Sequence, residues 1–126
     1  LGTKLKAVIA DNGAVYITLG FFMSLLDHLQ TWKDGKSKIF AAERFVVSIT
    51  PTLGNEKKAR YVEIDGNGLL GRATLWEDGS LELEALDKES EQTAIQASHV
   101  IATAAELGDC LNWWLSEIAI YAPPET

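Results

Sequence analysis

Acidic side chains crowd one short stretch of the chain, and two of them have the spacing of a paired-carboxylate site. Between Glu77 and Glu91 there are seven acids and one cation, Lys88. Glu82 and Glu84 would point the same way on a strand, as a hard-cation site or a glycosidase could use. Such metal sites usually draw ligands from folded loops, however, and a glycosidase needs a cleft. We therefore predict no metal site and interpret the acids as a solvated face that binds a cationic partner, with simple solubility as the alternative.

Other patterns with catalytic potential lack the context that their chemistry needs. Residues 66–71 have the spacing G-x-G-x-x-G, which cradles a pyrophosphate in a dinucleotide fold, but a strand-like segment follows instead of a helix. His28 and His99 are the only histidines, and no nucleophile motif accompanies them. Cys110 is the only cysteine, so a disulfide framework and a cysteine-based zinc site are excluded. The sequence therefore predicts a protein that is not an enzyme, with no catalytic residue and no cofactor.

The charge and hydropathy of the chain restrict its partners. The 126 residues carry a formal net charge of −7, and residues 73–126 contain only one cation, Lys88. Affinity for nucleic acid comes mostly from clustered Lys and Arg, so we expect no direct nucleic-acid binding. The longest nearly uncharged run, residues 14–26, is too short to cross a bilayer. We expect no membrane contact, a cytoplasmic location and a single domain over residues 1–126.

Apolar residues recur at helical spacing towards both ends of the chain. Residues 5–9 fit a short first helix, and a strand over residues 5–10 is the rival interpretation. A second helix is expected from about Val15 to Asp34-Gly35. Residues 103–106, Thr-Ala-Ala-Glu, form a capping box that opens a closing helix. The apolar stripe of that helix consists of Leu107, Leu111, Trp114, Leu115, Ile118 and Tyr121.

Between these helices the apolar period changes to two, which predicts strands. Alternation marks residues 45–50, 61–65 and 93–101, and two further strands flank Asp78-Gly79. Asp-Gly favours a two-residue type I′ turn, which would place Trp76 opposite Leu81. The core side of the hairpin would then consist of Thr74, Trp76, Leu81, Leu83 and Ala85. The other side would consist of Ala73, Leu75, Glu77, Glu82 and Glu84.

The predicted fold is α+β, a single domain with an antiparallel sheet of four to five strands. An N-terminal helix or helices and a C-terminal helix pack on one face of this sheet. The water-facing side supplies the candidate partner-binding residues, and Tyr61 and Leu75 are its expected desolvated anchors. The full candidate set is Tyr61, Glu63, Asp65, Leu75, Glu77, Asp78, Glu82 and Glu84. Trp113 lies beside Trp114 on the closing helix and is expected to be half exposed, covering a sheet edge or anchoring a partner.

The hairpin sequence also resembles a known family. Residues 71–79 read GRATLWEDG and residues 83–87 read LEALD. These segments resemble the TriTu family of bacterial immunity proteins, whose hallmark is a hairpin of the type G-R-x-T-x-W-E-x-G followed by an E-x-L-D strand end. The similarity extends through residues 96–99 and the closing helix, roughly the second half of the chain.

The resemblance implies an immunity protein of a contact-dependent growth inhibition system. Such a protein binds and blocks the C-terminal toxin domain that a neighbouring cell delivers. Toxins of this type are associated with cleavage of transfer RNA, and in one branch elongation factor Tu is part of the toxin complex. A nuclease needs a basic cleft for its polyanionic substrate, so an acidic sheet face could fill that cleft. A small acidic secretion chaperone, acting as a homodimer, is the alternative function.

Overall fold

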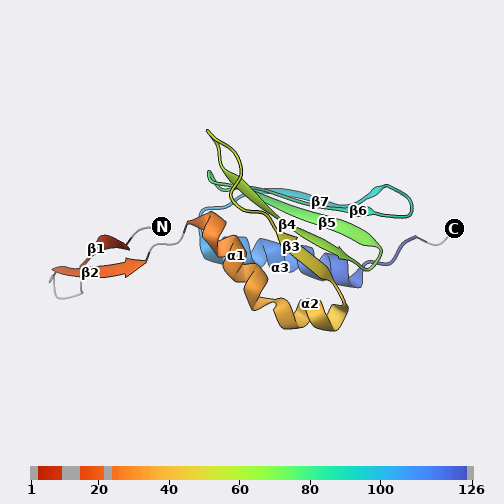
Figure 1. Ribbon diagram of the computed structural model, residues 1–126, viewed down its shortest axis with the longest axis horizontal. Coiled ribbons are helices and arrows are strands. Elements are labelled where there is room, and N and C mark those ends of the chain that lie inside the picture. The colour runs from red at the N-terminus through yellow and green to blue at the C-terminus, as the bar shows by residue number, and fades with distance from the viewer. Residues whose placement is uncertain (1–2, 10–14, 22–23, 125–126) are drawn as a thin grey trace.

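The computed structural model describes residues 3–9, 15–21 and 24–124 (Figure 1). The strands and helices in chain order are β1 (Thr3–Ile9), β2 (Val15–Phe21), α1 (Leu25–Gly35), α2 (Ser37–Glu43), β3 (Val46–Ile49), β4 (Ala59–Gly66), β5 (Leu69–Trp76), β6 (Ser80–Asp87), β7 (Thr93–Val100) and α3 (Ala104–Ile120). Strands β3 to β7 form one antiparallel sheet in sequence order. The predicted α+β class is confirmed.

The beginning of the chain differs from the helical interpretation. β1 and β2 pair with each other as a two-stranded antiparallel sheet, so the rival interpretation of a first strand is correct. The helix expected from about Val15 begins only at Leu25. Val15 and Ile17 are β-branched and favour strands, whereas Ser24 is a natural N-cap whose hydroxyl accepts from the amide of Asp27 at 3.2 Å. The predicted helix is therefore correct from Leu25 onward, and its expected first part, residues 15–21, is a strand.

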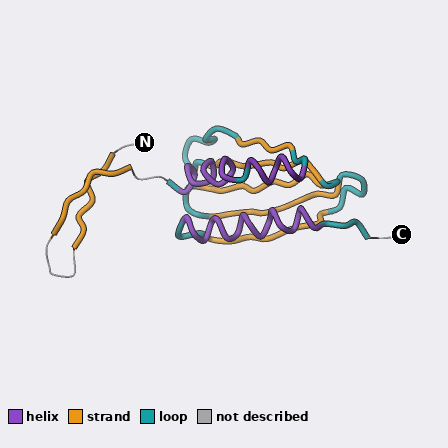
Figure 2. Tube along the Cα trace, turned by 90° about the horizontal axis from the view of Figure 1, so that it is seen from below, coloured by secondary structure: helices purple, strands orange, loops and turns teal. Residues whose placement is uncertain are grey.

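The helices cover one face of the five-stranded sheet. In Figures 1 and 2, α1 and α3 lie side by side against this face, with α1 over β4 and β5 and α3 over β5 to β7. Trp114 of α3 is fully buried between these layers, and its indole N–H donates to the carbonyl of Glu84 at 3.0 Å. The predicted cap of α3 is also present, because the Thr103 hydroxyl accepts from the amide of Glu106 at 3.1 Å. The predicted closing helix is confirmed.

The β5–β6 hairpin has a different turn from the one predicted. A type I′ turn needs positive φ at both central residues, but of the pair Asp78-Gly79 only Gly79 has it, at 93°. The amide of Gly79 donates to the carbonyl of Trp76 at 3.0 Å, which closes a three-residue loop over residues 77–79. A Cβ at Gly79 would collide with the carbonyl oxygen of Ile101, so glycine is required there. The type I′ turn instead lies at Asn67-Gly68, with φ of 52° and 76°, so the glycine-rich segment 66–71, predicted to be a loop, comprises the end of β4, this two-residue turn and the start of β5, with no helix after it.

The longer loop shifts the register of β5 by one residue. Leu75 lies opposite Leu81 and Thr74 lies opposite Glu82. Leu75 is fully buried on the helix-covered face, so its placement among the partner-binding residues is wrong. Trp76, expected in the core, lies on the opposite face. Glu82 still points away from the core as predicted, because the slip changes the alternation of β5 and leaves that of β6 intact.

Candidate functional site: the open face of the sheet

The sheet face opposite the helices lies uppermost in Figure 1, and we call it the open face. It carries the outward-pointing side chains of the central strands. Strand register arranges these side chains in rows. One row crosses β4 to β7 as Glu63, Arg72, Glu84 and Gln96. The next row crosses the same strands as Tyr61, Thr74, Glu82 and Ser98. The sequence-predicted residues of β4 and β6 are therefore neighbours on one surface.

Arg72 organises the middle of the open face. Its guanidinium donates to Glu63 at 3.2 Å and lies 4.3 Å from the ring centroid of Tyr61. Stacking over an aromatic ring and pairing with a carboxylate both suit the flat guanidinium. Arg72 could not be singled out from the sequence, because its partners are identified only once the register of β5 is known. Tyr61 is half-buried and Arg72 is exposed, and together they form an amphipathic platform.

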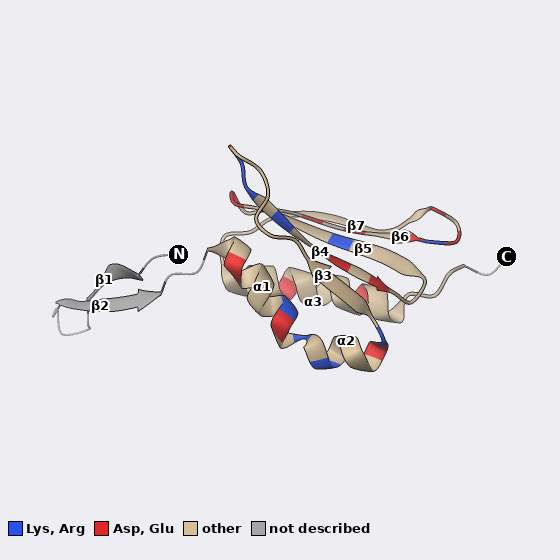
Figure 3. Cartoon of the chain, viewed as in Figure 1, with Lys and Arg blue, Asp and Glu red and all other residues tan. Residues whose placement is uncertain are grey.

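Two further predicted acids are ion-paired within the molecule. Lys88 contacts Asp65, and Lys57 contacts Asp78 at 2.7 Å. The Lys57 ammonium, followed by the backbone amide of Ser80, lowers the pKa of Asp78 from 3.8 to about 2. Figure 3 shows the resulting mixture of acidic and basic residues on the sheet. The expectation of a uniformly acidic face is therefore wrong for Asp65 and Asp78, as it is for Glu63.

The carboxylates of β6 keep a different environment. Glu82 accepts hydrogen bonds from the Ser98 hydroxyl at 2.7 Å and from the Gln96 amide at 3.1 Å. Glu84 is exposed beside Arg72 in the register, and no ion pair joins the two side chains. Within residues 24–124, neither Glu82 nor Glu84 has a salt bridge to Lys or Arg. These two carboxylates on β6, together with the exposed Glu77 of the hairpin loop, are the candidate acids that no Lys or Arg of the described residues neutralises.

The other candidate chemistry is not assembled in the described part of the chain. No three side chains of His, Cys, Asp or Glu there lie close enough together to hold a metal ion. Cys110 is half-buried on α3, and burial, followed by the charges of Asp109 and Glu106, raises the pKa of its thiol. A thiol with a raised pKa is a poor nucleophile. None of the helices in the described ranges is long and apolar enough to span a bilayer.

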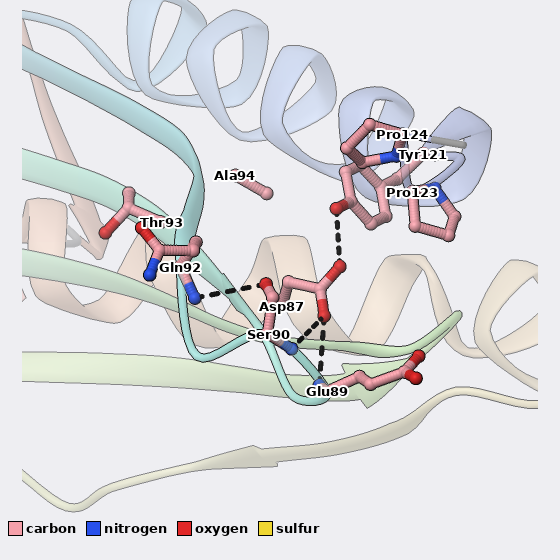
Figure 4. A pocket seen from close by; sticks show the side chains of 9 residues that line it. All are labelled: Asp87, Glu89, Ser90, Gln92, Thr93, Ala94, Tyr121, Pro123 and Pro124. Atoms are coloured by element: carbon pink, nitrogen blue, oxygen red, sulfur yellow. Dashed lines mark hydrogen bonds between the residues drawn. The ribbon is translucent and has the colours of Figure 1, made fainter. Parts of the chain in front are cut away.

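A hollow of about 920 Å³ lies where the β6–β7 loop approaches the end of α3 (Figure 4). Its floor holds Asp87, which is 6% exposed and accepts from the Tyr121 hydroxyl at 2.6 Å and from the amides of Glu89 and Ser90. The Tyr121 hydroxyl and then the Ser90 amide lower the pKa of Asp87, while the carboxylate raises the pKa of Tyr121. Both oxygens of Asp87 already have partners, so this acid ties the loop to the helix. In the sequence, Asp87 is only one of the seven acids between Glu77 and Glu91.

Comparison with known protein families identifies the family of this chain. The fold is that of a small α+β protein with a five-stranded antiparallel sheet whose one face is covered by helices. A family model described as immunity protein TriTu matches residues 27–117. The chain therefore belongs to the TriTu family of immunity proteins. The matched segment contains the whole five-stranded sheet and leaves out β1 and β2. A search of curated proteins finds no match.

Proposed function

We propose that the chain neutralises the toxin of a contact-dependent growth inhibition system by covering the toxin's basic substrate cleft with the open face. The toxin would be a transfer-RNA-cleaving nuclease that the chain meets in the cytoplasm. Membership in an immunity-protein family supports a toxin-neutralising role, and it favours this function over the secretion chaperone. The observation that carries the proposed mechanism is the pair Glu82 and Glu84, two neighbouring carboxylates without a Lys or Arg partner in the described residues.

Charge would guide the encounter, and the central platform would hold the complex. A cleft that attracts a phosphate backbone also attracts the β6 carboxylates, which accelerates association at low salt. Ser98 and Gln96 hold the Glu82 side chain in place, so little conformational entropy is lost when it meets a cation. Tyr61, covered by Arg72, is the anchor because desolvated aromatics and arginines dominate most interfaces.

The remaining candidate residues form the rim of this contact. Glu77 is exposed at the hairpin loop next to Asp78, and no salt bridge joins it to a cation in the part of the chain described. Glu63, Asp65 and Asp78 can contribute only by sharing or exchanging their internal partners, so we expect each to matter less than Glu82. Elongation factor Tu would be reached through the toxin complex and not through direct contact.

Inhibition of the toxin in solution tests the proposal. The toxin domain encoded beside this chain is mixed with labelled transfer RNA and titrated with the purified protein. We expect cleavage to stop at a one-to-one ratio, and sedimentation to show one copy of each protein in the complex. Undiminished cleavage at saturating protein would contradict the proposal. A homodimer that holds an unfolded client segment would support the chaperone instead.

A further inference from the structure

The two edge strands of the sheet differ in how they are protected. β3 has four residues, and Pro51 follows it closely. β7 has eight residues, TAIQASHV, without Lys, Arg, Asp, Glu or Pro. Edge strands usually carry charges, prolines or bulges because their open hydrogen-bonding groups invite pairing with another chain. β7 lacks the charged and proline side chains that discourage such pairing.

The β6–β7 register shifts near the start of β7, where Ala85 pairs with Ile95 and Leu86 with Thr93, and beyond this irregularity the backbone of β7 presents a regular row of hydrogen-bonding groups at the edge. The amide of Ile101 donates to the carbonyl of Gly79 at 2.8 Å, which continues the β6–β7 register. Hydrogen-bonded and non-bonded pairs alternate along an antiparallel ladder, so Gln96, Ser98 and Val100 direct their amides and carbonyls away from β6. No other backbone segment in the described ranges pairs with them. Three consecutive docking positions for an added strand are therefore available.

A groove between β7 and α3 lies beneath this edge. Two hollows, of about 370 and 320 Å³, share Trp113 as a wall. Ile95 lines the first, and Ala97 and His99 line the second, all from the side of β7 that faces α3. Trp113 is 42% exposed, so it only partly covers the sheet edge. A strand added to β7 would point alternate side chains over these two hollows, which is how strand addition acquires side-chain specificity.

The charges around the groove select its occupant. Asp109 lines one hollow and Glu117 the other, and neither α3 nor β7 contains Lys or Arg. A second copy of the chain would bring the same acids against each other, in a protein whose net charge is already −7. A segment with apolar residues at alternate positions and Lys or Arg beside them matches both the hollows and the acids.

We infer that β7 accepts an extended, basic segment of the toxin as an additional strand of the sheet, with its apolar side chains in the two hollows beside Trp113. This inference rests on the proposed function and gives the toxin a second contact besides the open face. Main-chain hydrogen bonds to Gln96, Ser98 and Val100 would supply affinity, and Asp109 and Glu117 would select a cationic sequence.

Amide hydrogen exchange, resolved by NMR in the free protein and in its complex with the toxin domain, tests the inference without any substitution. We expect the amides of Gln96, Ser98 and Val100 to exchange at least about tenfold more slowly in the complex. The matched control is Val47, whose amide also points outward, on β3, and should not change. Thr50 fixes that orientation, because its amide donates to the carbonyl of Tyr61 at 3.0 Å.

The exchange results separate failure of the inference from failure of the proposed function. A complex that inhibits the toxin but leaves the β7 amides unprotected overturns the inference and leaves the proposed function standing. Absence of any complex overturns both. Protection that appears in the free protein and grows with its concentration identifies a second copy as the occupant, which also overturns the inference.

A substitution at the edge provides an independent readout. Ser98→Pro removes an outward amide without breaking a β6–β7 hydrogen bond, and we expect it to weaken toxin binding at least about tenfold. Ser98→Ala keeps the amide and loses the hydroxyl bond to Glu82, so any weakening that it shows belongs to that bond, and Ser98→Pro should bind at least about tenfold more weakly than Ser98→Ala. Equal affinity of the two variants would contradict the inference. If Ser98→Pro does not fold, the double variant Asp109→Lys with Glu117→Lys takes its place in the test. An affinity for the toxin equal to that of the wild type would then contradict the inference.

Discussion

The two faces of the same sheet follow different physical rules. The helix-covered face is closed and apolar, and side chains such as Leu75, Leu83 and Trp114 are completely buried there. The open face carries charged side chains that pair with one another at the surface, as Arg72 does with Glu63. Burial of apolar area supplies most of the folding free energy, whereas surface ion pairs contribute about 0–1 kcal/mol each. The closed face therefore determines the fold, and the open face contributes little to its stability.

The largest expected effect comes from the closed face. Trp114→Ala removes the buried indole and its hydrogen bond to the Glu84 carbonyl, and we expect a loss of about 3–5 kcal/mol in the free energy of unfolding. Urea denaturation measures this loss. The adjacent Trp113 is 42% exposed, so Trp113→Ala should cost about 1 kcal/mol or less. Equal losses in the two variants would refute the division between a buried and an exposed tryptophan.

A second pair of neighbouring residues tests the strand register. Leu75→Ala should destabilise the protein by about 2–4 kcal/mol, because Leu75 is fully buried under the helices. Trp76→Ala, on the open face, should cost less than about 1.5 kcal/mol although it removes a larger side chain. Thermal unfolding of both variants provides the comparison. The reverse order of stability would restore the register that the Asp-Gly turn predicted.

Arg72 separates stability from binding on the open face. Arg72→Gln loses the ion pair with Glu63 and the stacking on Tyr61, which should cost about 1 kcal/mol of stability. The same change makes the face more negative, so association with a basic toxin should become about two- to threefold faster at low salt. Stopped-flow fluorescence measures the association rate. A slower association would show that Arg72 assists the encounter itself.

The smallest expected effect concerns Asp78, an acid that is already ion-paired with Lys57. The pKa of Asp78 is lowered to about 2, so its ion pair stabilises the folded protein above about pH 3.8 and is lost as the pH falls through about 2. We expect the wild type to melt slightly above Asp78→Asn at pH 5, with the difference shrinking as the pH falls from 3.8 to 2. A difference independent of pH would show that Lys57 does not control this carboxylate.

The sequence predicted the features that depend on local pattern. Alternation along β6 was enough to turn Glu82 outward, and the capping box located the start of α3 at Thr103. The register of β5 was not predictable in this way, because the turn type depends on the close approach of Gly79 to Ile101, which is distant in sequence. The hairpin sequence alone contains no information about that contact.

The neutralised acids show the same limit. Arg72 reaches Glu63 only in the observed register, and Lys57 and Lys88 approach Asp78 and Asp65 from loops. Charge counting along the chain recorded the acids but could not assign their partners. The sequence therefore predicted which strands supply the candidate face more reliably than it predicted the charge of that face.

Charge reversal on β6 tests the role of the open face most directly. The association rate of the toxin domain is measured over a range of salt concentrations for the wild type and for the double variant Glu82→Lys with Glu84→Lys. Glu43→Lys, on α2, is the control, because it reverses one exposed charge, half of the change in the double variant, on a helix outside the open face. We expect the double variant to associate at least about tenfold more slowly at low salt and with a weaker salt dependence, while Glu43→Lys shows a much smaller change. Equal rates for the wild type and the double variant would contradict the proposal that the open face meets the toxin.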